Sequence, residues 1–338
     1  RMLATQETGT GAMGQISTLL KAVIATSLTM QALLAIMFLP RFLAMGIDPA
    51  HAVWDAVFMA ISVFNNAGFV ILPEGLAPHV TDWWMLIPII LGTTVGAIGF
   101  PVIMDVAKNL RRPRRWRLHT KLTLATYLIL AFVGALALAL TEWHNPATLG
   151  SIDTPSKILN AMLAGVNSRS SGLSALDVGS MQSQTHFVQD ILMMIGGGSA
   201  STAGGVKVTT FAVLVLAVIA EARGDRDIET FGRRIPTSTV RLAVAVSLLG
   251  LAMVAISVVL LLSLTDHSLD VILFETVSAF ATVGLSTGVT PTLPVGAKYV
   301  LIALMFAGRT GSMTVAAALA LRERSRVIRM PEEQPIIG

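Results

Sequence analysis

Three short segments of this sequence could line an ion pathway with main-chain carbonyl groups. Each follows an apolar stretch and has glycine in its third place: Asn66-Ala67-Gly68-Phe69, Ser170-Ser171-Gly172-Leu173 and Thr282-Val283-Gly284-Leu285. Glycine adopts backbone dihedrals that other residues avoid and lets the backbone approach an ion closely. Carbonyl oxygens can replace the hydration shell of an ion, so side chains are free to differ between copies. We therefore predict a cation site formed by the carbonyls of Asn66, Ala67, Ser170, Ser171, Thr282 and Val283.

Related sequence precedes these glycines. The stretches before Gly68 and Gly284 share phenylalanine at two places and serine at one when they are aligned on the glycine. The matched pairs are Phe58 with Phe274, Phe64 with Phe280, and Ser62 with Ser278. Gly172, whose preceding stretch is more divergent, lies 104 residues after Gly68 and 112 residues before Gly284. A repeat this long, with one such element per copy, predicts a pore built by pseudo-symmetry.

Ten consecutive small residues interrupt the fourth apolar stretch: Gly196, Gly197, Gly198, Ser199, Ala200, Ser201, Thr202, Ala203, Gly204 and Gly205. Small residues also line closely packed membrane helices, which is the alternative interpretation. So many glycines and hydroxyls disfavour a continuous helix, so we predict a broken helix whose middle is a flexible gate loop beneath the carbonyls. Lys207 stands at the end of this loop and is predicted to anchor it.

Two arginines are expected near these elements. An arginine at the bilayer centre costs at least about 2.5–3.5 kcal/mol on insertion scales, so Arg309, inside the last apolar stretch, should face the protein interior. There it could stabilise the gate loop through backbone carbonyls or set an electrostatic barrier below the filter. Arg169 precedes the middle glycine segment, and we expect it to pack behind the loop against Asp177 and not to face the ion.

Composition places the chain in a membrane. Hydrophobic residues make up 54% and charged residues 13%, with a mean hydropathy of +0.72. Soluble domains have about 25% charged residues. The chain has no cysteine, which excludes disulfides, thiolate catalysis and cysteine metal sites.

The predicted fold is an all-α polytopic membrane protein of repeated helix–pore-helix–helix units. Six stretches are long enough to cross a bilayer: 16–39, 84–107, 118–140, 187–220, 240–264 and 296–321. Shorter pieces at 50–64, 155–167 and 269–281 are expected to dip in as pore helices, although one such piece alone would suit an interfacial helix. The predicted units are 16–110, 118–220 and 237–321, with linkers 111–117 and 221–236 and a tail 322–338.

Basic residues gather between and after these units. They are Lys108, Arg111, Arg112, Arg114, Arg115, Arg117 and Lys121, then Arg223, Arg226, Arg233, Arg234 and Arg241, then Arg322, Arg324, Arg326 and Arg329. Between membrane spans such clusters follow the positive-inside rule and are expected to face the cytoplasm, with no nucleic acid as partner.

Three units leave a fourfold ring incomplete. Cation pores usually arrange four equivalent loops around one axis, and one period before Gly68 falls before residue 1. We expect a pseudo-fourfold pore with its first unit absent from this sequence and residues 1–15 as the linker after it. A pore of three loops is the alternative.

In these motifs the chain resembles the Trk/Ktr/HKT superfamily of potassium transporters, most closely the bacterial Ktr-type membrane subunit. The motifs are FNNAGF (64–69), NSRSSGL (167–173), ATVGLSTG (281–288), the GGGSASTAGGVK loop and GRTG (308–311). The resemblance implies K⁺ bound at the filter carbonyls, Na⁺ as a regulator, and a multi-pass protein of the bacterial plasma (inner) membrane. It also implies a homodimer in the lipid bilayer and a cytosolic KtrA/TrkA-like ring that binds the regulatory nucleotide.

Other functions would require different sequence features. A sodium-permeable HKT-like transporter is the first alternative, because in plant relatives a serine replaces the glycine of the first filter, which this sequence does not contain. An organic-solute transporter would need inverted repeats, whereas these repeats share one orientation. An intramembrane hydrolase would need a Ser–His pair or paired aspartates within spans, but the histidines lie in loops or at helix ends, so no enzyme is expected.

Substitution of Gly284 by serine tests the filter assignment. Gly284→Ser is expected to lower the affinity or selectivity for K⁺, because a side chain adds bulk and removes backbone freedom. The measurement is K⁺ uptake kinetics in proteoliposomes, and unchanged kinetics would remove Gly284 from the filter.

Overall fold

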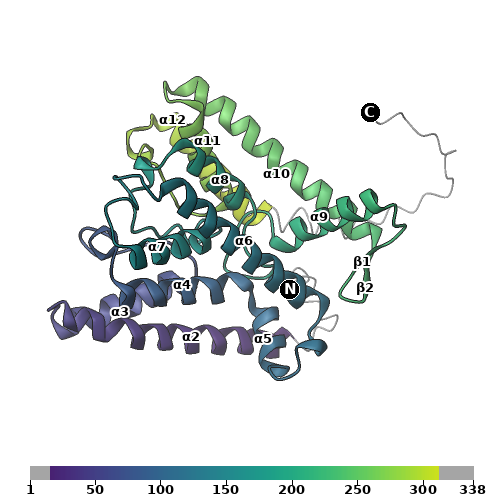
Figure 1. The fold of residues 1–338 in the computed structure, drawn as a ribbon, viewed down its shortest axis with the longest axis horizontal. Coiled ribbons are helices and arrows are strands. Elements are labelled where there is room, and N and C mark those ends of the chain that lie inside the picture. The colour runs from purple at the N-terminus through teal and green to yellow at the C-terminus, as the bar shows by residue number, and fades with distance from the viewer. Residues whose placement is uncertain (1–15, 312–338) are drawn as a thin grey trace.

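The computed structural model describes residues 16–311, which form three successive units of helices (Figure 1). The first contains α2 (Ile16–Ala44), α3 (Pro49–Phe64), α4 (Trp83–Ile98) and α5 (Phe100–Lys108). The second contains α6 (Leu118–Glu142), α7 (Thr154–Asn167), α8 (Ser183–Met194) and α9 (Val208–Arg223). The third contains α10 (Thr237–Leu264), α11 (Leu269–Ala281) and α12 (Val295–Phe306), which runs into a π-helical turn, Ala307–Gly311.

Each unit begins with a long helix followed by a short one. The long helices α2, α6 and α10 have 29, 25 and 28 residues, and the short helices α3, α7 and α11 have 16, 14 and 13. The starts of α3 and α7 are fixed by Asp48 and Asp153, whose carboxylates accept backbone N–H groups of the first turn. Pro49 and Pro155 follow these caps, where the missing N–H of proline costs nothing.

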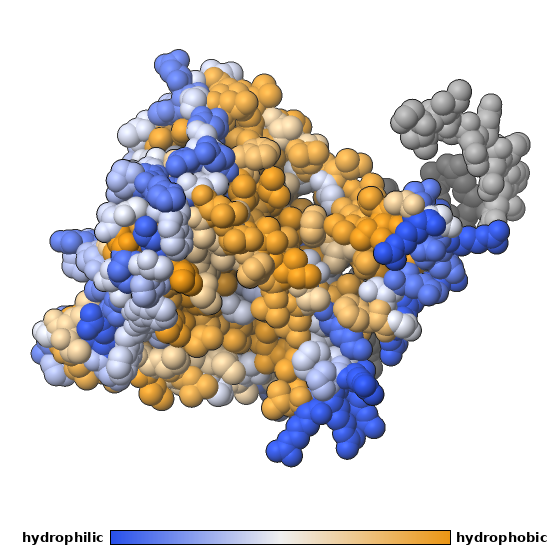
Figure 2. All heavy atoms as spheres, viewed as in Figure 1, coloured by the Kyte–Doolittle hydropathy of each residue, from blue (hydrophilic) through white to orange (hydrophobic). Residues whose placement is uncertain are grey.

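Three helices within residues 16–311 are long and apolar enough to cross a membrane, and a fourth crosses if α4 and α5 count as one span. Figure 2 shows the matching surface, with hydrophobic side chains across the middle and hydrophilic ones at opposite ends. The end that carries the linkers 111–117 and 221–236 is called the inner side here, and the opposite end the outer side. The predicted span 296–321 lies partly outside the described residues.

The prediction of a continuous span over 84–107 is wrong. The chain turns by 95° between α4 and α5. Gly99 at the turn has a φ of +92°, and a Cβ there would lie 2.6 Å from the Ser199 carbonyl oxygen. Only glycine fits both the backbone conformation and the contact, and Pro101 then restarts the helix in its first turn.

The linker 221–236 also departs from the predicted all-α fold. Strands β1 (Ile228–Thr230) and β2 (Arg233–Ile235) pair antiparallel across a turn at Phe231 and Gly232, both with positive φ. Two positive φ values are the signature of the tight turns that join hairpin strands. Ile228 and Ile235 pack into a small apolar cluster with side chains of α9 and α10, so the hairpin is fixed to the helices.

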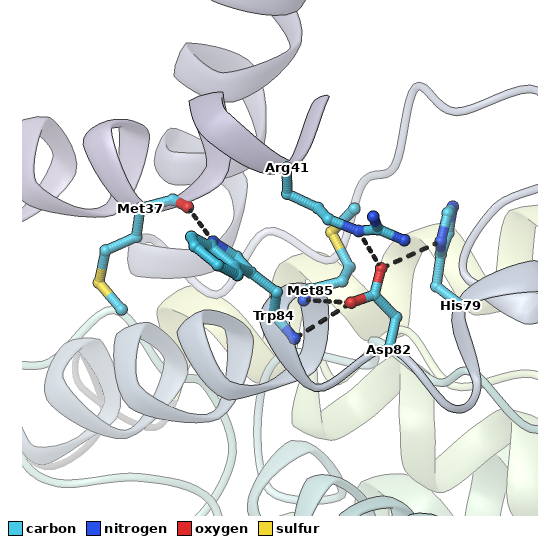
Figure 3. Close-up of polar contacts among 6 residues, drawn as sticks. All are labelled: Met37, Arg41, His79, Asp82, Trp84 and Met85. Atoms are coloured by element: carbon cyan, nitrogen blue, oxygen red, sulfur yellow. Dashed lines mark hydrogen bonds and ion pairs between the residues drawn. The ribbon is translucent and has the colours of Figure 1, made fainter. Parts of the chain in front are cut away.

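An ion pair joins the outer ends of α2 and α4 (Figure 3). Arg41 Nε lies 2.5 Å from Asp82 Oδ2, and His79 Nδ1 lies 3.6 Å from the same oxygen. The other carboxylate oxygen, Oδ1, caps α4 by accepting the backbone N–H groups of Trp84 and Met85. One aspartate therefore both starts α4 and holds it against α2.

Removal of this aspartate should cost more stability than removal of a simple cap. Asp82→Ala is expected to lower the free energy of unfolding by about 1–3 kcal/mol, because the cap and the ion pair are lost together. Asp48→Ala removes an exposed cap of α3 and should cost about 0.5–1 kcal/mol. The measurement is unfolding in detergent, and equal shifts for the two variants would contradict the double role of Asp82.

Candidate functional site

The three glycine segments lie next to one another at the C-terminal ends of α3, α7 and α11. A Cβ on Gly68 would collide with the carbonyl oxygen of Ser171, and a Cβ on Gly172 would collide with the carbonyl oxygen of Val283. The same Cβ on Gly172 would lie 2.7 Å from the carbonyl carbon of Gly284. The segments therefore follow one another in chain order, and each of these two glycines leaves space for a carbonyl of the next segment.

A polar side chain of each short helix holds the backbone just after the glycine. The donor is the same in α3 and α11, a serine hydroxyl, and in α7 it is an asparagine amide. The three bonds run from Ser62 Oγ to the Phe69 carbonyl (2.7 Å), from Asn167 Nδ2 to the Leu173 carbonyl (2.6 Å) and from Ser278 Oγ to the Leu285 carbonyl (2.6 Å). These clamps bind one carbonyl of each segment and fix the position of the loop after the glycine.

Sequence comparison found only part of this arrangement. Ser62 and Ser278 match in the aligned repeats, whereas Asn167 is displaced by one place and was not singled out. The backbone hydrogen bonds show that Asn167 is the equivalent residue. Its carbonyl accepts the N–H of Gly172, five residues later, just as the Ser62 carbonyl accepts the N–H of Ala67, five residues later. A search for a polar residue at the end of each short helix would have found it.

Two of the segments contain a left-handed residue that is not glycine. Asn66 has a φ of 52° and Thr282 a φ of 51°, and each lies two places before the glycine. Asparagine tolerates this conformation, but a β-branched residue there is an outlier, and such strain concentrates at functional sites. The Thr282 hydroxyl is also buried without a hydrogen-bond partner among the described residues.

The middle segment is the most enclosed. Ser170 and Ser171 are buried, and neither hydroxyl has a hydrogen-bond partner among the residues of the structure. The residue after the glycine is 3% exposed at Leu173 and 5% exposed at Leu285, but Phe69 is 68% exposed. Nothing described lies within 4 Å of a Cβ built on Gly284. The residues 16–311 thus leave one side of the segments open, beside the first and the third.

Arg169 is fully buried behind the middle segment. The prediction that it packs against Asp177 is wrong. Asp177 instead accepts hydrogen bonds from the Gly179 N–H and the Ser180 hydroxyl. The guanidinium carbon of Arg169 lies 3.5 Å from the centre of the Tyr127 ring, and its nitrogens have no hydrogen-bond partner within the described chain. The contact with the ring face is therefore the compensation that the structure offers to this buried cation.

The run of small residues forms the loop between α8 and α9. Its ends are joined where Gly196 N–H donates to the Val206 carbonyl (2.7 Å). Gly198 N–H donates to the Ala97 carbonyl (2.7 Å), which ties the loop to α4 near the break at Gly99. Such bonds supply the backbone partners that a loop within a membrane needs.

The same loop touches the first and third segments. Asn66 Nδ2 donates to Thr202 Oγ1 at 2.5 Å, and a Cβ on Gly204 would collide with the Thr282 hydroxyl oxygen. Arg309 Nη1 donates to the Thr202 carbonyl at 2.5 Å, and Lys207 Nζ donates to the Ala203 carbonyl at 2.7 Å. The structure therefore brings the predicted filter and gate residues together, with both cationic side chains bound to loop carbonyls.

A buried carboxylate, Glu275 on α11, organises the chain after the third segment. It accepts hydrogen bonds from the hydroxyls of Ser286, Thr287 and Thr290 and from the Thr287 N–H, at 2.6–2.9 Å. Nothing in the sequence points to this residue, since a single glutamate in an apolar stretch shows no partner. Among the described residues no group of three or more His, Cys, Asp or Glu side chains could hold a metal ion.

The family model and the relatives that match this chain are all described as cation or potassium transport proteins. The family model TrkH, described as a cation transport protein, matches residues 2–328. The chain is 36% identical over 338 residues to the Ktr system potassium uptake protein B of Bacillus subtilis, covering 100% of the chain and 75% of that protein. It is 35% identical over 284 residues to the protein of that name in Vibrio alginolyticus, covering 84% of the chain but only 62% of that relative.

Two further proteins are similar. The potassium/sodium uptake protein NtpJ of Enterococcus hirae is 31% identical over 312 residues, which cover 90% of the chain and 67% of that protein. The crystal structure of the potassium transporter TrkH from Vibrio parahaemolyticus matches with a TM-score of 0.71 at 18% identity, covering 92% of the chain and 66% of that structure. At this identity the structural match is evidence for the fold alone.

The contact between Arg169 and Tyr127 gives a prediction about stability. Tyr127→Phe keeps the ring and loses a hydroxyl that has no hydrogen-bond partner among the described atoms, so it should change the free energy of unfolding by less than about 0.5 kcal/mol. Tyr127→Leu also removes the ring face and should cost about 2–4 kcal/mol.

Phe38→Leu is the control for loss of a buried ring, since Phe38 stacks on Phe42 in α2 without a cation. Thermal unfolding in detergent gives all three values. Equal costs for Tyr127→Leu and Phe38→Leu would contradict a stabilising contact between Arg169 and the ring.

Proposed function

The chain belongs to the TrkH family of cation transport proteins, and from this premise we propose that it mediates potassium uptake across the bacterial plasma membrane. The ion would pass between the backbone carbonyls of the segments at Gly68, Gly172 and Gly284. The names of the relatives support the choice of potassium. The observation that carries the proposal is the packing of the Ser171 and Val283 carbonyls against the glycine of the neighbouring segment.

The physical basis is the replacement of the water around the ion. Main-chain oxygens held at fixed positions can exchange for a hydration shell without a charged side chain. The three short helices end at this place, and the C-terminal end of a helix carries a partial negative charge that favours a cation. The serine and asparagine clamps keep the oxygens at their spacing as ions pass.

The pore would have pseudo-fourfold symmetry. The segments contact one another in chain order, at Gly68 with Ser171 and at Gly172 with Val283, and the open side lies beside Gly284 and the exposed Phe69. A fourth segment of the same kind would close the ring there and would cover the phenylalanine, as Leu173 and Leu285 are covered.

The loop of residues 196–207 would be the gate. It lies against the first and third segments, so an ion that leaves the carbonyls would meet it next. Opening would require the bonds of Thr202 to Asn66 and Arg309 to break while the loop base at Gly196 stays closed. Arg309 also places a positive charge on the path, which raises the barrier while the loop is closed.

Assembly and regulation follow from the family resemblance. We propose a homodimer that associates with a cytosolic nucleotide-binding ring, with the nucleotide bound by the ring, and with Na⁺ as a regulator. Sodium permeation is a second candidate function, because one relative is a potassium/sodium uptake protein.

Cation uptake into proteoliposomes tests the proposal. K⁺ and Rb⁺ flux should saturate and strongly exceed Na⁺ flux, and comparable Na⁺ flux would favour the sodium-permeable alternative. If folded protein shows no cation flux in the presence of the cytosolic ring, the proposal that these segments form a pore is wrong.

The clamp on the third segment should set selectivity. Ser278→Ala removes two hydrogen bonds, the one donated to the Leu285 carbonyl and the one accepted from the Gly284 N–H, each worth about 1 kcal/mol. The ratio of K⁺ to Na⁺ flux should therefore fall by about fivefold or more. Ser263→Ala is the control, because the Ser263 hydroxyl bonds only to a carbonyl of its own helix, α10. An unchanged ratio in Ser278→Ala would show that the clamp does not position the carbonyls.

A further inference from the structure

The inner end of the first unit carries an unusual concentration of positive charge. Seven basic residues and no acidic residue lie between Asp105 and Glu142: Lys108, Arg111, Arg112, Arg114, Arg115, Arg117 and Lys121. The five residues 111–115 are all exposed. None of the seven side chains forms an ion pair in the part of the chain that the structure describes, where the ion pairs involve other residues.

This basic loop, residues 109–117, has a defined shape. Asp105, buried at the end of α5, accepts the Arg117 N–H at 2.9 Å and the Thr120 hydroxyl at 2.7 Å. Trp116 Nε1 donates to the Asn109 carbonyl at 3.2 Å, which closes the loop on itself. The arginines thus project from a backbone that is already ordered, so binding of an anion would not have to order the loop.

The helix before the loop is placed like a helix at a membrane surface. α5 lies at 95° to α4, so it runs across the direction of a spanning helix. It carries partly buried apolar residues beside the charges, Ile103, Met104 and Val106, and Leu110 after it is 68% exposed. An amphipathic helix with basic residues at its polar side lies in the plane of the interface.

The surface views place this loop at the border of the apolar region. In Figure 1 α5 turns down from α4 at the lower edge of the molecule, and in Figure 2 hydrophilic side chains project from that edge directly beside hydrophobic ones. A basic group at this border would lie beside the headgroups of a bilayer that covers the apolar region.

We propose that α5 and the basic loop bind anionic phospholipid headgroups of the inner leaflet. Charge complementarity and the position at the apolar border favour lipid over an acidic protein partner. Clusters of four to eight basic residues next to a membrane helix attract anionic lipids, each contributing independently near the surface. The proposal does not depend on which ion the pore carries.

The linker after α9 provides a matched comparison. Arg223, Arg226, Arg233 and Arg234 are also exposed, but four acidic residues lie just before or among them, Glu221, Asp225, Asp227 and Glu229. Arg234 Nη2 lies 3.0 Å from Asp227 Oδ1. Replacing these four arginines by glutamine changes the net charge as much as replacing four arginines of the basic loop. It does so without removing a cluster of positive charges that has no acidic neighbours.

The test is lipid retention by the purified protein in mixed micelles. Bound phosphatidylglycerol and phosphatidylcholine are counted by native mass spectrometry, for the wild type, for R111Q/R112Q/R114Q/R115Q and for R223Q/R226Q/R233Q/R234Q. The first variant should lose its preference for phosphatidylglycerol by at least about tenfold, and the second should keep most of it. The wild-type preference should also fall in about 1 M salt, where the Debye length is about 3 Å.

Equal losses in the two variants would overturn the proposal, because net charge alone would then explain binding. A first variant that keeps its lipid preference but no longer binds the cytosolic ring would also overturn it, in favour of a protein partner. Both variants are exposed-surface changes, and their monodispersity in size-exclusion chromatography shows that they fold.

Discussion

Backbone that leaves the helix at the middle of a bilayer has to find partners for every N–H and C=O inside the protein or in a watery cavity. Four stretches of this chain meet that constraint, the three glycine segments and the loop between α8 and α9. The segments are held by side chains of their own helices, such as Ser278, and the loop is held by carbonyls and amides of other units, such as Ala97. The hydroxyl groups of Ser170, Ser171 and Thr282, which lie on these segments, are buried without a hydrogen-bond partner among the described residues.

Three buried or loop-bound charged side chains lie around the glycine segments. Glu275 lies on the outer side, where it holds the loop after the third segment, and a negative charge there attracts cations. Arg309 donates to the Thr202 carbonyl of the loop between α8 and α9, and Arg169 lies against the ring of Tyr127. In the proposed pore a cation would therefore enter toward Glu275, exchange water for carbonyls, and meet the positive charge of Arg309 before it could leave.

Much of the fold was predictable because periodicity and length are local properties of sequence. The short helices α3, α7 and α11 and the interruption after α8 lie where the apolar stretches and small residues indicate. The break at Gly99 was missed, because one glycine in an apolar run gives no sign of the Ser199 carbonyl that it contacts. The ring beneath Arg169 was missed for the same reason, since contacts between units depend on packing and not on spacing. The filter and gate assignments rest on geometry and stay predictions.

The most direct test of the account is to locate the ion. Rb⁺ replaces K⁺ in carbonyl sites and can be identified by anomalous scattering in crystals of the protein. A carbonyl-lined pore predicts an anomalous peak enclosed by backbone oxygens of the segments at Gly68, Gly172 and Gly284, absent when Rb⁺ is replaced by Li⁺. A peak bound only by side-chain carboxylates, or crystals soaked in Rb⁺ with no peak at these segments, would contradict it.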